Sequence, residues 1–269
     1  GESETEFSQR LALELEQTIR NTGPDFIAAF FAEPVMGAGG VIPPPDGYFQ
    51  AIQPVLRKYG IPLIADEVIC GFGRTGHMWG SETLDIKPDT ITMAKAITSA
   101  YMPLGAVTVS EPVYEALVDE SKKLGVFAHG FTYSGHPVAA AVAVKTLEIY
   151  ERIDIVGHVQ KVAATFKARL DKLNDHPLVG ETRGVGLLAG IEIVRDKEAR
   201  TSFDIRAGVG AKIAAIAQEE GVILRAVAGD TIAVCPPLVI SADEINDMFD
   251  RIDRAFDRGL GWVRNEVKA

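Results

Sequence analysis

Short runs of apolar residues alternate with longer stretches at helical spacing over the first part of the chain. The runs at residues 26–32, 61–65, 90–94 and 104–109 have the length of strands. The first run is apolar throughout, which predicts a strand buried on both faces. Helical spacing over residues 48–59 separates the first two runs. Strands that alternate with helices predict a layered α/β sheet.

Two helices have a marked beginning in the sequence. Ser3 with Glu6, and Ser241 with Glu244, match the capping box, in which a serine and a glutamate three residues later bond each other's backbone N–H groups. Glycine and proline at 23–24 are expected to end the first of these helices.

The pattern changes in the second half of the chain. Helical spacing continues over residues 136–152 and then to about residue 175. Residues 184–194 alternate like one strand with an exposed face, and residues 222–227 and 231–234 predict a hairpin.

These patterns predict three parts. We expect a large domain over residues 1–150, a linking helix over 151–175, and a small α+β domain over 176–269.

Composition and charge exclude several classes of protein. The chain has 269 residues, 47% of them hydrophobic, which is typical of a globular protein. Its formal net charge of -10 argues against nucleic acid as a partner. Two cysteines, Cys70 and Cys235, cannot form a disulfide framework or a four-thiolate metal site, so we expect no metal and a cytoplasmic location. The longest apolar run, 137–144, is too short for a membrane span.

Two charged residues follow apolar runs. Asp66 comes after the run at 61–65, and Lys95 after the run at 90–94. Ligands of open α/β sheets bind at the carboxyl ends of strands. Taken alone, a strand-end aspartate more often faces solvent or caps a helix, and a lysine there can reach the surface. Together they supply what a pyridoxal ring needs: a lysine for a Schiff base and an acid against the ring nitrogen.

Four longer motifs occur in order along the chain. They are FAEPVMGAGGV at 31–41, DEVICGFGRTG at 66–76, MAKA at 93–96 and GFTYSGHP at 130–137. This series resembles the class III (omega) aminotransferases, fold-type-I enzymes that use pyridoxal 5'-phosphate (PLP), and the resemblance covers essentially the whole chain. It implies a partial large domain, with a mostly parallel sheet and helices on both faces, followed by a small α+β domain.

The resemblance implies roles for five residues. Lys95 would hold the cofactor as a Schiff base and act as acid and base, and Asp66 would pair with the pyridine nitrogen. Val68, two residues on and on the same side, would pack on the ring, while Glu33 would support the base of the site. Thr132 would hydrogen-bond the cofactor phosphate of the neighbouring subunit. Without the motifs, Val68 would be an ordinary core residue and Thr132 a loop cap.

Other residues bear on the substrate. The resemblance implies that Arg225 binds a substrate carboxylate, to which a guanidinium presents a planar fork. A surface strand position is the alternative for Arg225, and plain packing is the alternative for Trp79, a second candidate for the pocket. Ala38 and Ile69 stand where ornithine and 4-aminobutyrate enzymes usually have Glu and Gln. Both departures favour the amine:pyruvate and beta-alanine:pyruvate type.

The expected activity is that of a transaminase. An amine or omega-amino acid would give its amino group to pyruvate or another 2-oxo acid. A same-fold aminomutase or decarboxylase, and a non-catalytic fragment that supplies only dimer surface, are the alternatives. The family resemblance implies a homodimer or a dimer of dimers with shared active sites.

The resemblance also implies that part of the site lies elsewhere. In the family, the phosphate-binding loop and the aromatic residue on the other ring face lie upstream, and no such segments are evident in this chain. The chain has no initiator methionine and opens inside a helical pattern. We therefore expect a large domain that is incomplete at its N-terminal side, and an isolated fragment that binds the cofactor poorly.

Overall fold

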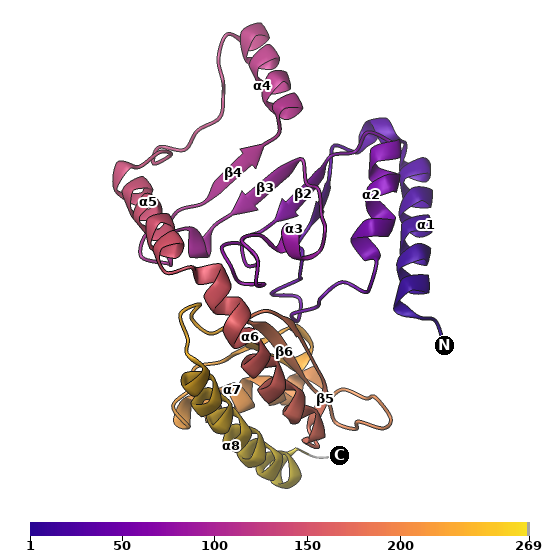
Figure 1. Ribbon diagram of the computed structural model, residues 1–269. Coiled ribbons are helices and arrows are strands. Elements are labelled where there is room, and N and C mark those ends of the chain that lie inside the picture. Colours follow the sequence, from indigo (N-terminus) through magenta and orange to yellow (C-terminus); the bar gives the residue numbers. More distant parts are fainter. Residues whose placement is uncertain (268–269) are drawn as a thin grey trace. The chain divides into compact units, whose positions relative to one another are not determined.

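The computed structural model of the protein describes residues 1–267, which divide into two compact units (Figure 1). The first unit comprises Gly1–Pro34, Pro44–Phe72 and Met78–Asp154. The second comprises Val35–Pro43, Gly73–His77 and the described residues from Ile155 onward. No helix in the described part of the chain is both long and apolar enough to cross a bilayer.

The first unit is an α/β unit. Its elements are α1 (Glu4–Thr22), η1 (Pro24–Phe26), β1 (Phe30–Ala32), α2 (Tyr48–Lys58), β2 (Leu63–Asp66), α3 (Gly80–Thr83), β3 (Thr90–Met93), η2 (Lys95–Thr98), β4 (Ala106–Val109), α4 (Glu111–Leu124) and α5 (Pro137–Arg152). The capping box of Ser3 and Glu6 is present at the start of α1, and Gly23 ends this helix.

A four-stranded sheet with the order β1-β2-β3-β4 forms the centre of this unit. β1, β2 and β3 are parallel, and β4 runs antiparallel to β3. The expected mostly parallel sheet is therefore confirmed. Because β2 and β3 are neighbours and parallel, their carboxyl ends lie at the same edge of the sheet.

One hydrophobic core of this unit lies between two helices and the β1–β2 side of the sheet. α1 and α2 lie side by side (Figure 1). Their buried apolar side chains meet those of β2, with Ile19, Ile52 and Leu56 at 2% exposure or less. Burial of each such side chain contributes about 1.5–3 kcal/mol relative to an exposed position.

The apolar run at 26–32 does not form one buried strand, contrary to the prediction. Pro24, which has no N–H group for a ladder, starts the short helix η1, and Phe26 is 85% exposed. β1 itself is an edge strand of the described sheet. Its Phe30 and Ala32 pack on the α1–α2 core, so the alternating residue Phe31 points to the other face and is 57% exposed.

The second unit has an antiparallel sheet with helices. Its elements are α6 (Ile155–Lys172), η3 (Leu173–Asp175), β5 (Val179–Val185), β6 (Leu188–Ile193), η4 (Ile205–Ala207), α7 (Val209–Glu219), β7 (Arg225–Val227), η5 (Ala228–Asp230), β8 (Thr231–Val234) and α8 (Ala242–Glu266). The strand order is β5-β6-β8-β7. The predicted β7–β8 hairpin and the capping box at the start of α8 are both present.

Residues 184–194 form a hairpin rather than the single strand that their alternation predicted. β5 and β6 pair antiparallel around a tight turn at Gly186 and Leu187. Gly186 has a φ of 60°, and a Cβ at this position would lie 2.5 Å from the carbonyl oxygen of Arg74. β6 lies between β5 and β8 in the sheet, and side chains of both its faces are buried, so neither face is exposed.

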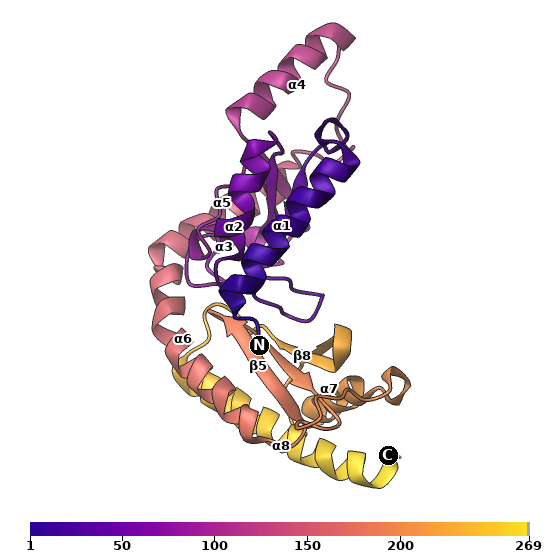
Figure 2. The same cartoon turned by 90° about the vertical axis from the view of Figure 1, so that its right-hand side faces the viewer.

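Helices α6 and α8 run alongside each other in this unit (Figure 2). Phe166 of α6 and Phe249 of α8 are fully buried and meet edge to face, with ring centroids 5.4 Å apart. Of residues 151–175, expected as a linking helix, the first four belong to the first unit, and the rest, mostly α6, belong to the second.

Arg183 of β5 fastens the Val35–Pro43 segment to the sheet of the second unit. Its Nη2 donates to the carbonyl oxygen of Gly40 at 2.9 Å, and its Nε donates to that of Val41 at 3.0 Å. Arg183 also pairs with Glu192 of β6. The glycine-rich loop is thereby held by a half-buried arginine that the sequence motifs did not indicate.

Candidate active site

Asp66, the last residue of β2, is half-buried, and both hydrogen bonds to its carboxylate are made to the same oxygen. Its Oδ1 accepts from the backbone N–H of Val68 at 3.0 Å and from the hydroxyl of Thr92 at 3.1 Å. Within residues 1–267, Oδ2 has no donor. One carboxylate oxygen is thus anchored to the protein and the other is available to a ligand.

Lys95 begins η2, two residues after β3 ends at Met93. Its φ is 47°, a left-handed value that is uncommon for a residue with a side chain and costs about 1–2 kcal/mol. Such backbone strain clusters at functional sites. The lysine side chain is exposed, and it forms no ion pair with any described residue.

Tyr150 of α5 holds the strained segment in place. Its hydroxyl donates to the carbonyl oxygen of Ala96 at 2.8 Å. Because that bond uses the only hydroxyl proton of Tyr150, the 2.7 Å contact with Ser99 must have the serine hydroxyl as donor. Ser99 is itself left-handed, with a φ of 49°. A buried tyrosine therefore fixes the turn that carries Lys95.

Glu67 is fully buried beside the candidate catalytic aspartate. Its carboxylate accepts from the backbone N–H groups of Gly80 at 2.8 Å and Ser81 at 2.7 Å, at the start of α3. A Cβ at Gly80 would lie 2.7 Å from the Cβ of Cys70, so this close approach requires glycine. The Glu67 carboxylate therefore joins the start of the loop after β2 to its end at α3.

We expect Glu67→Gln to lower the free energy of unfolding by about 1–3 kcal/mol, because the amide turns an N–H donor toward a buried backbone N–H. Denaturant unfolding followed by fluorescence would measure the change. Glu82→Gln is the matched control, since Glu82 is exposed and its one donor among the described residues is Trp79 N–H, a bond that glutamine can keep. An equal loss in the two variants would contradict this role for Glu67.

The structure places the other predicted cofactor residues of the first unit as follows. Glu33 directly follows β1 and is half-buried. Val68 is half-buried but lies in a turn, because β2 ends at Asp66, so strand alternation does not set its direction. Trp79 packs on Phe72, with ring centroids 4.9 Å apart, which favours the packing alternative.

Thr132 and Arg225 are both exposed. Thr132 lies in the turn between α4 and α5, which is closed by the Ser134 backbone N–H donating to the carbonyl oxygen of Phe131 at 2.9 Å. Arg225 begins the edge strand β7 in the second unit, and it has no ion-pair partner in the described part of the chain. Six of the seven predicted residues thus belong to the first unit, and only Arg225 belongs to the second.

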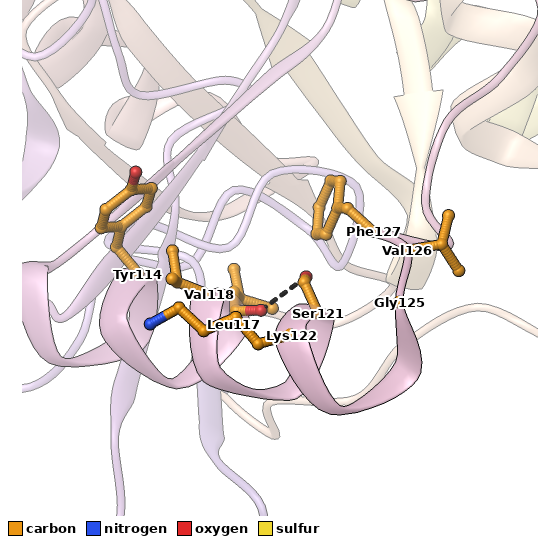
Figure 3. Close-up of a pocket in the computed structure, with 8 residues that line it drawn as sticks. All are labelled: Tyr114, Leu117, Val118, Ser121, Lys122, Gly125, Val126 and Phe127. Carbon is orange, nitrogen blue, oxygen red and sulfur yellow. Dashed lines mark hydrogen bonds between the residues drawn. The ribbon is translucent and has the colours of Figure 1, made fainter.

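An open hollow of about 580 Å³ runs along α4, apart from these residues (Figure 3). Apolar side chains such as Leu117, Val126 and Phe127 form most of its lining. The hydroxyl of Ser121 donates to the carbonyl oxygen of Leu117 at 2.7 Å within the helix. The hollow therefore offers apolar surface, and none of the predicted site residues lines it.

Comparison with known proteins places this chain in a family. Residues 2–256 match the family model described as Aminotransferase class-III. A protein of Solanum lycopersicum named gamma aminobutyrate transaminase 3, chloroplastic, is 50% identical over 255 residues, which are 95% of this chain and 49% of that protein. An uncharacterized aminotransferase of Sinorhizobium fredii is 49% identical over 95% of this chain and 55% of its own length.

Solved structures agree with the sequence comparisons. A structure described as a transaminase with L-Ala superposes with a TM-score of 0.94 at 50% identity, covering 98% of this chain and 62% of that one. The omega transaminase from Pseudomonas jessenii in complex with PMP gives a TM-score of 0.95 at 47% identity, covering 99% and 58%. The chain spans about half the length of the curated relatives it matches. It belongs to the class III aminotransferase family.

Proposed function

We propose that this chain supplies Lys95 and Asp66 to the active site of a transaminase that uses pyridoxal 5'-phosphate. The observation that supports the proposal is the location of the two residues, at the carboxyl ends of neighbouring parallel strands. Class III aminotransferases use this cofactor, and one similar structure holds PMP.

The residues present fit the cofactor. The pyridine nitrogen needs an acceptor that keeps it protonated, and Oδ2 of Asp66 has no donor among the described residues. The aldehyde needs an unpaired amine, and Lys95 is exposed without an ion pair. When bound, PLP supplies the aldehyde and an electron-withdrawing ring.

The side chains of the protein would bind the cofactor and move the substrate proton. The Asp66 carboxylate would accept a hydrogen bond from the ring N–H and stabilise its positive charge. The free amine of Lys95 would serve as the base that holds and moves the proton of the substrate Cα. The η2 backbone holds this lysine at the sheet edge through Tyr150. Glu33, Val68 and Thr132 are proposed to contact the cofactor, with Thr132 reaching that of a second subunit in a homodimer.

The proposed reaction moves an amino group from an amine or omega-amino acid to pyruvate or another 2-oxo acid. Relatives at about half identity are named gamma aminobutyrate transaminases, so 4-aminobutyrate joins simple amines and beta-alanine as a candidate donor. A panel of these donors against pyruvate and 2-oxoglutarate, with the full-length enzyme, tests the proposal. Amino transfer to a supplied 2-oxo acid supports it, whereas loss of carbon dioxide or internal migration of the amino group overturns it.

We expect Arg225→Ala to lower kcat/KM for carboxylate-bearing donors by roughly 10- to 100-fold, the value of one hydrogen-bonded charge pair. For simple amines kcat/KM should change by less than about twofold, because they have no carboxylate for the guanidinium to bind. The 2-oxo acid also carries a carboxylate, so the comparison requires the donor half-reaction in single-turnover experiments.

Arg206→Ala is the control for this substitution. Arg206 lies in the same unit, is exposed, and within the described part of the chain pairs with Asp204 alone. Its loss should leave both donor classes unchanged. Equal losses for amines and amino acids in Arg225→Ala would remove Arg225 from the substrate site.

A further inference from the structure

The carboxylate of Asp66 is oriented by two donors that both bind the same oxygen. The backbone N–H of Val68 and the hydroxyl of Thr92 reach Oδ1 at 3.0 and 3.1 Å. The terminal torsion of aspartate is broad and roughly two-fold, so a single donor would leave the carboxylate free to rock. Two donors from different directions fix both Oδ1 and, through the planar group, the direction of Oδ2.

Thr92 comes to this position by strand register. Asp66 of β2 and Thr92 of β3 are directly paired in the parallel ladder. The backbone carbonyl oxygen of Thr92 also accepts from the N–H of Glu67 at 2.9 Å, which holds the end of β2 against β3. As a β-branched residue in a strand, Thr92 has few side-chain rotamers, so its hydroxyl is held where the carboxylate needs it.

We propose that Thr92 is a positioning residue, whose hydroxyl aims the free oxygen of Asp66 at the ring nitrogen of the cofactor. The inference rests on the proposed function. Thr92 does not touch the reacting atoms and acts through Asp66 alone. Loss of its hydroxyl should therefore weaken protonation of the ring nitrogen without removing the cofactor.

The full-length enzyme with three substitutions tests this role. Thr92→Val keeps the shape and removes the hydroxyl, and Thr92→Ser keeps a hydroxyl. Thr90→Val makes the same change two residues earlier on the same face of β3, where the described structure gives the hydroxyl no hydrogen bond. Circular dichroism and cofactor content establish that each variant is folded and loaded.

NMR of cofactor labelled at the ring nitrogen supplies a readout that a purely structural role would not move. We expect Thr92→Val to shift this resonance toward the unprotonated form and to lower kcat about tenfold. Thr92→Ser should restore both values, and Thr90→Val should match the parent. A parent-like resonance and kcat in loaded Thr92→Val would overturn the inference, as would equal effects of the two valine variants.

Asp66→Asn, measured in the same way, separates this inference from the proposed function. If Asp66→Asn moves the ring-nitrogen resonance and Thr92→Val does not, only the role of Thr92 fails. If neither substitution moves it, the proposed role of Asp66 fails as well.

Discussion

Replacing Lys95 with alanine is expected to lower turnover of the full-length enzyme by roughly a thousandfold or more and to remove the visible absorption of bound cofactor. Under the proposed function two roles are lost together, since Lys95 is proposed to be both the amine that links to the aldehyde and the base that moves the substrate proton. The η2 turn presents Lys95 from a left-handed backbone position held by Tyr150, and no other lysine among residues 1–267 has a left-handed backbone.

Borohydride reduction followed by peptide mass measurement locates the linkage directly. The cofactor should be found on the peptide that contains Lys95 and be absent from it in the Lys95→Ala variant. Lys87→Ala is the control, since Lys87 is exposed and pairs with Asp85 before β3 begins. A label on another lysine, or near-normal turnover in Lys95→Ala, would refute the central assignment.

The Asp66→Asn substitution is expected to lower turnover by roughly a hundredfold or more, the usual cost of losing one preorganised charge. The hydrogen bonds of Asp66 give a specific reason. Val68 and Thr92 both donate to Oδ1, so the amide oxygen of asparagine will take this position. The amide NH2 group then faces the ring nitrogen, and two donors oppose each other unless the ring loses its proton.

Asp89→Asn is the matched control for this change. Asp89 lies at the opposite end of the same sheet, just before β3, and its carboxylate accepts from the backbone N–H of Leu63 at 2.8 Å. Asparagine can keep that bond through its carbonyl oxygen. Turnover and ring-nitrogen protonation should therefore stay near the parent values. If Asp66→Asn behaves like Asp89→Asn, the proposed pairing with the pyridine nitrogen is wrong.

Local spacing in the sequence predicted most of the element order. The helix starts at Ser3 and Ser241 are capping boxes in the structure, because a capping box depends only on residues three apart. The ends of β2 and β3 also lie close to where the apolar runs stop. The two strand ends place Asp66 and Lys95 at the edge of the sheet. They could be predicted from local sequence alone, and the structure confirms them.

Two predictions that depended on the neighbours of a strand in the folded chain were wrong. The β5–β6 hairpin looked like one alternating strand, because alternation does not mark the tight turn at Gly186, and the close approach of this turn to the backbone of Arg74 is visible only in the structure. The run at 26–32 looked like a buried strand, but its burial depends on which neighbours cover each face. Apolar composition alone does not supply that information.

The family could be recognised from the sequence, because each motif, including those that contain Asp66 and Lys95, is a contiguous run of residues. How these groups are held could be seen only in the folded chain. Thr92 bonds Asp66 across 26 residues, Glu67 bonds Gly80 across 13, and Tyr150 bonds Ala96 across 54. A hydrogen bond needs its two atoms within about 3 Å and correctly aligned, and strand register and helix packing bring these partners together.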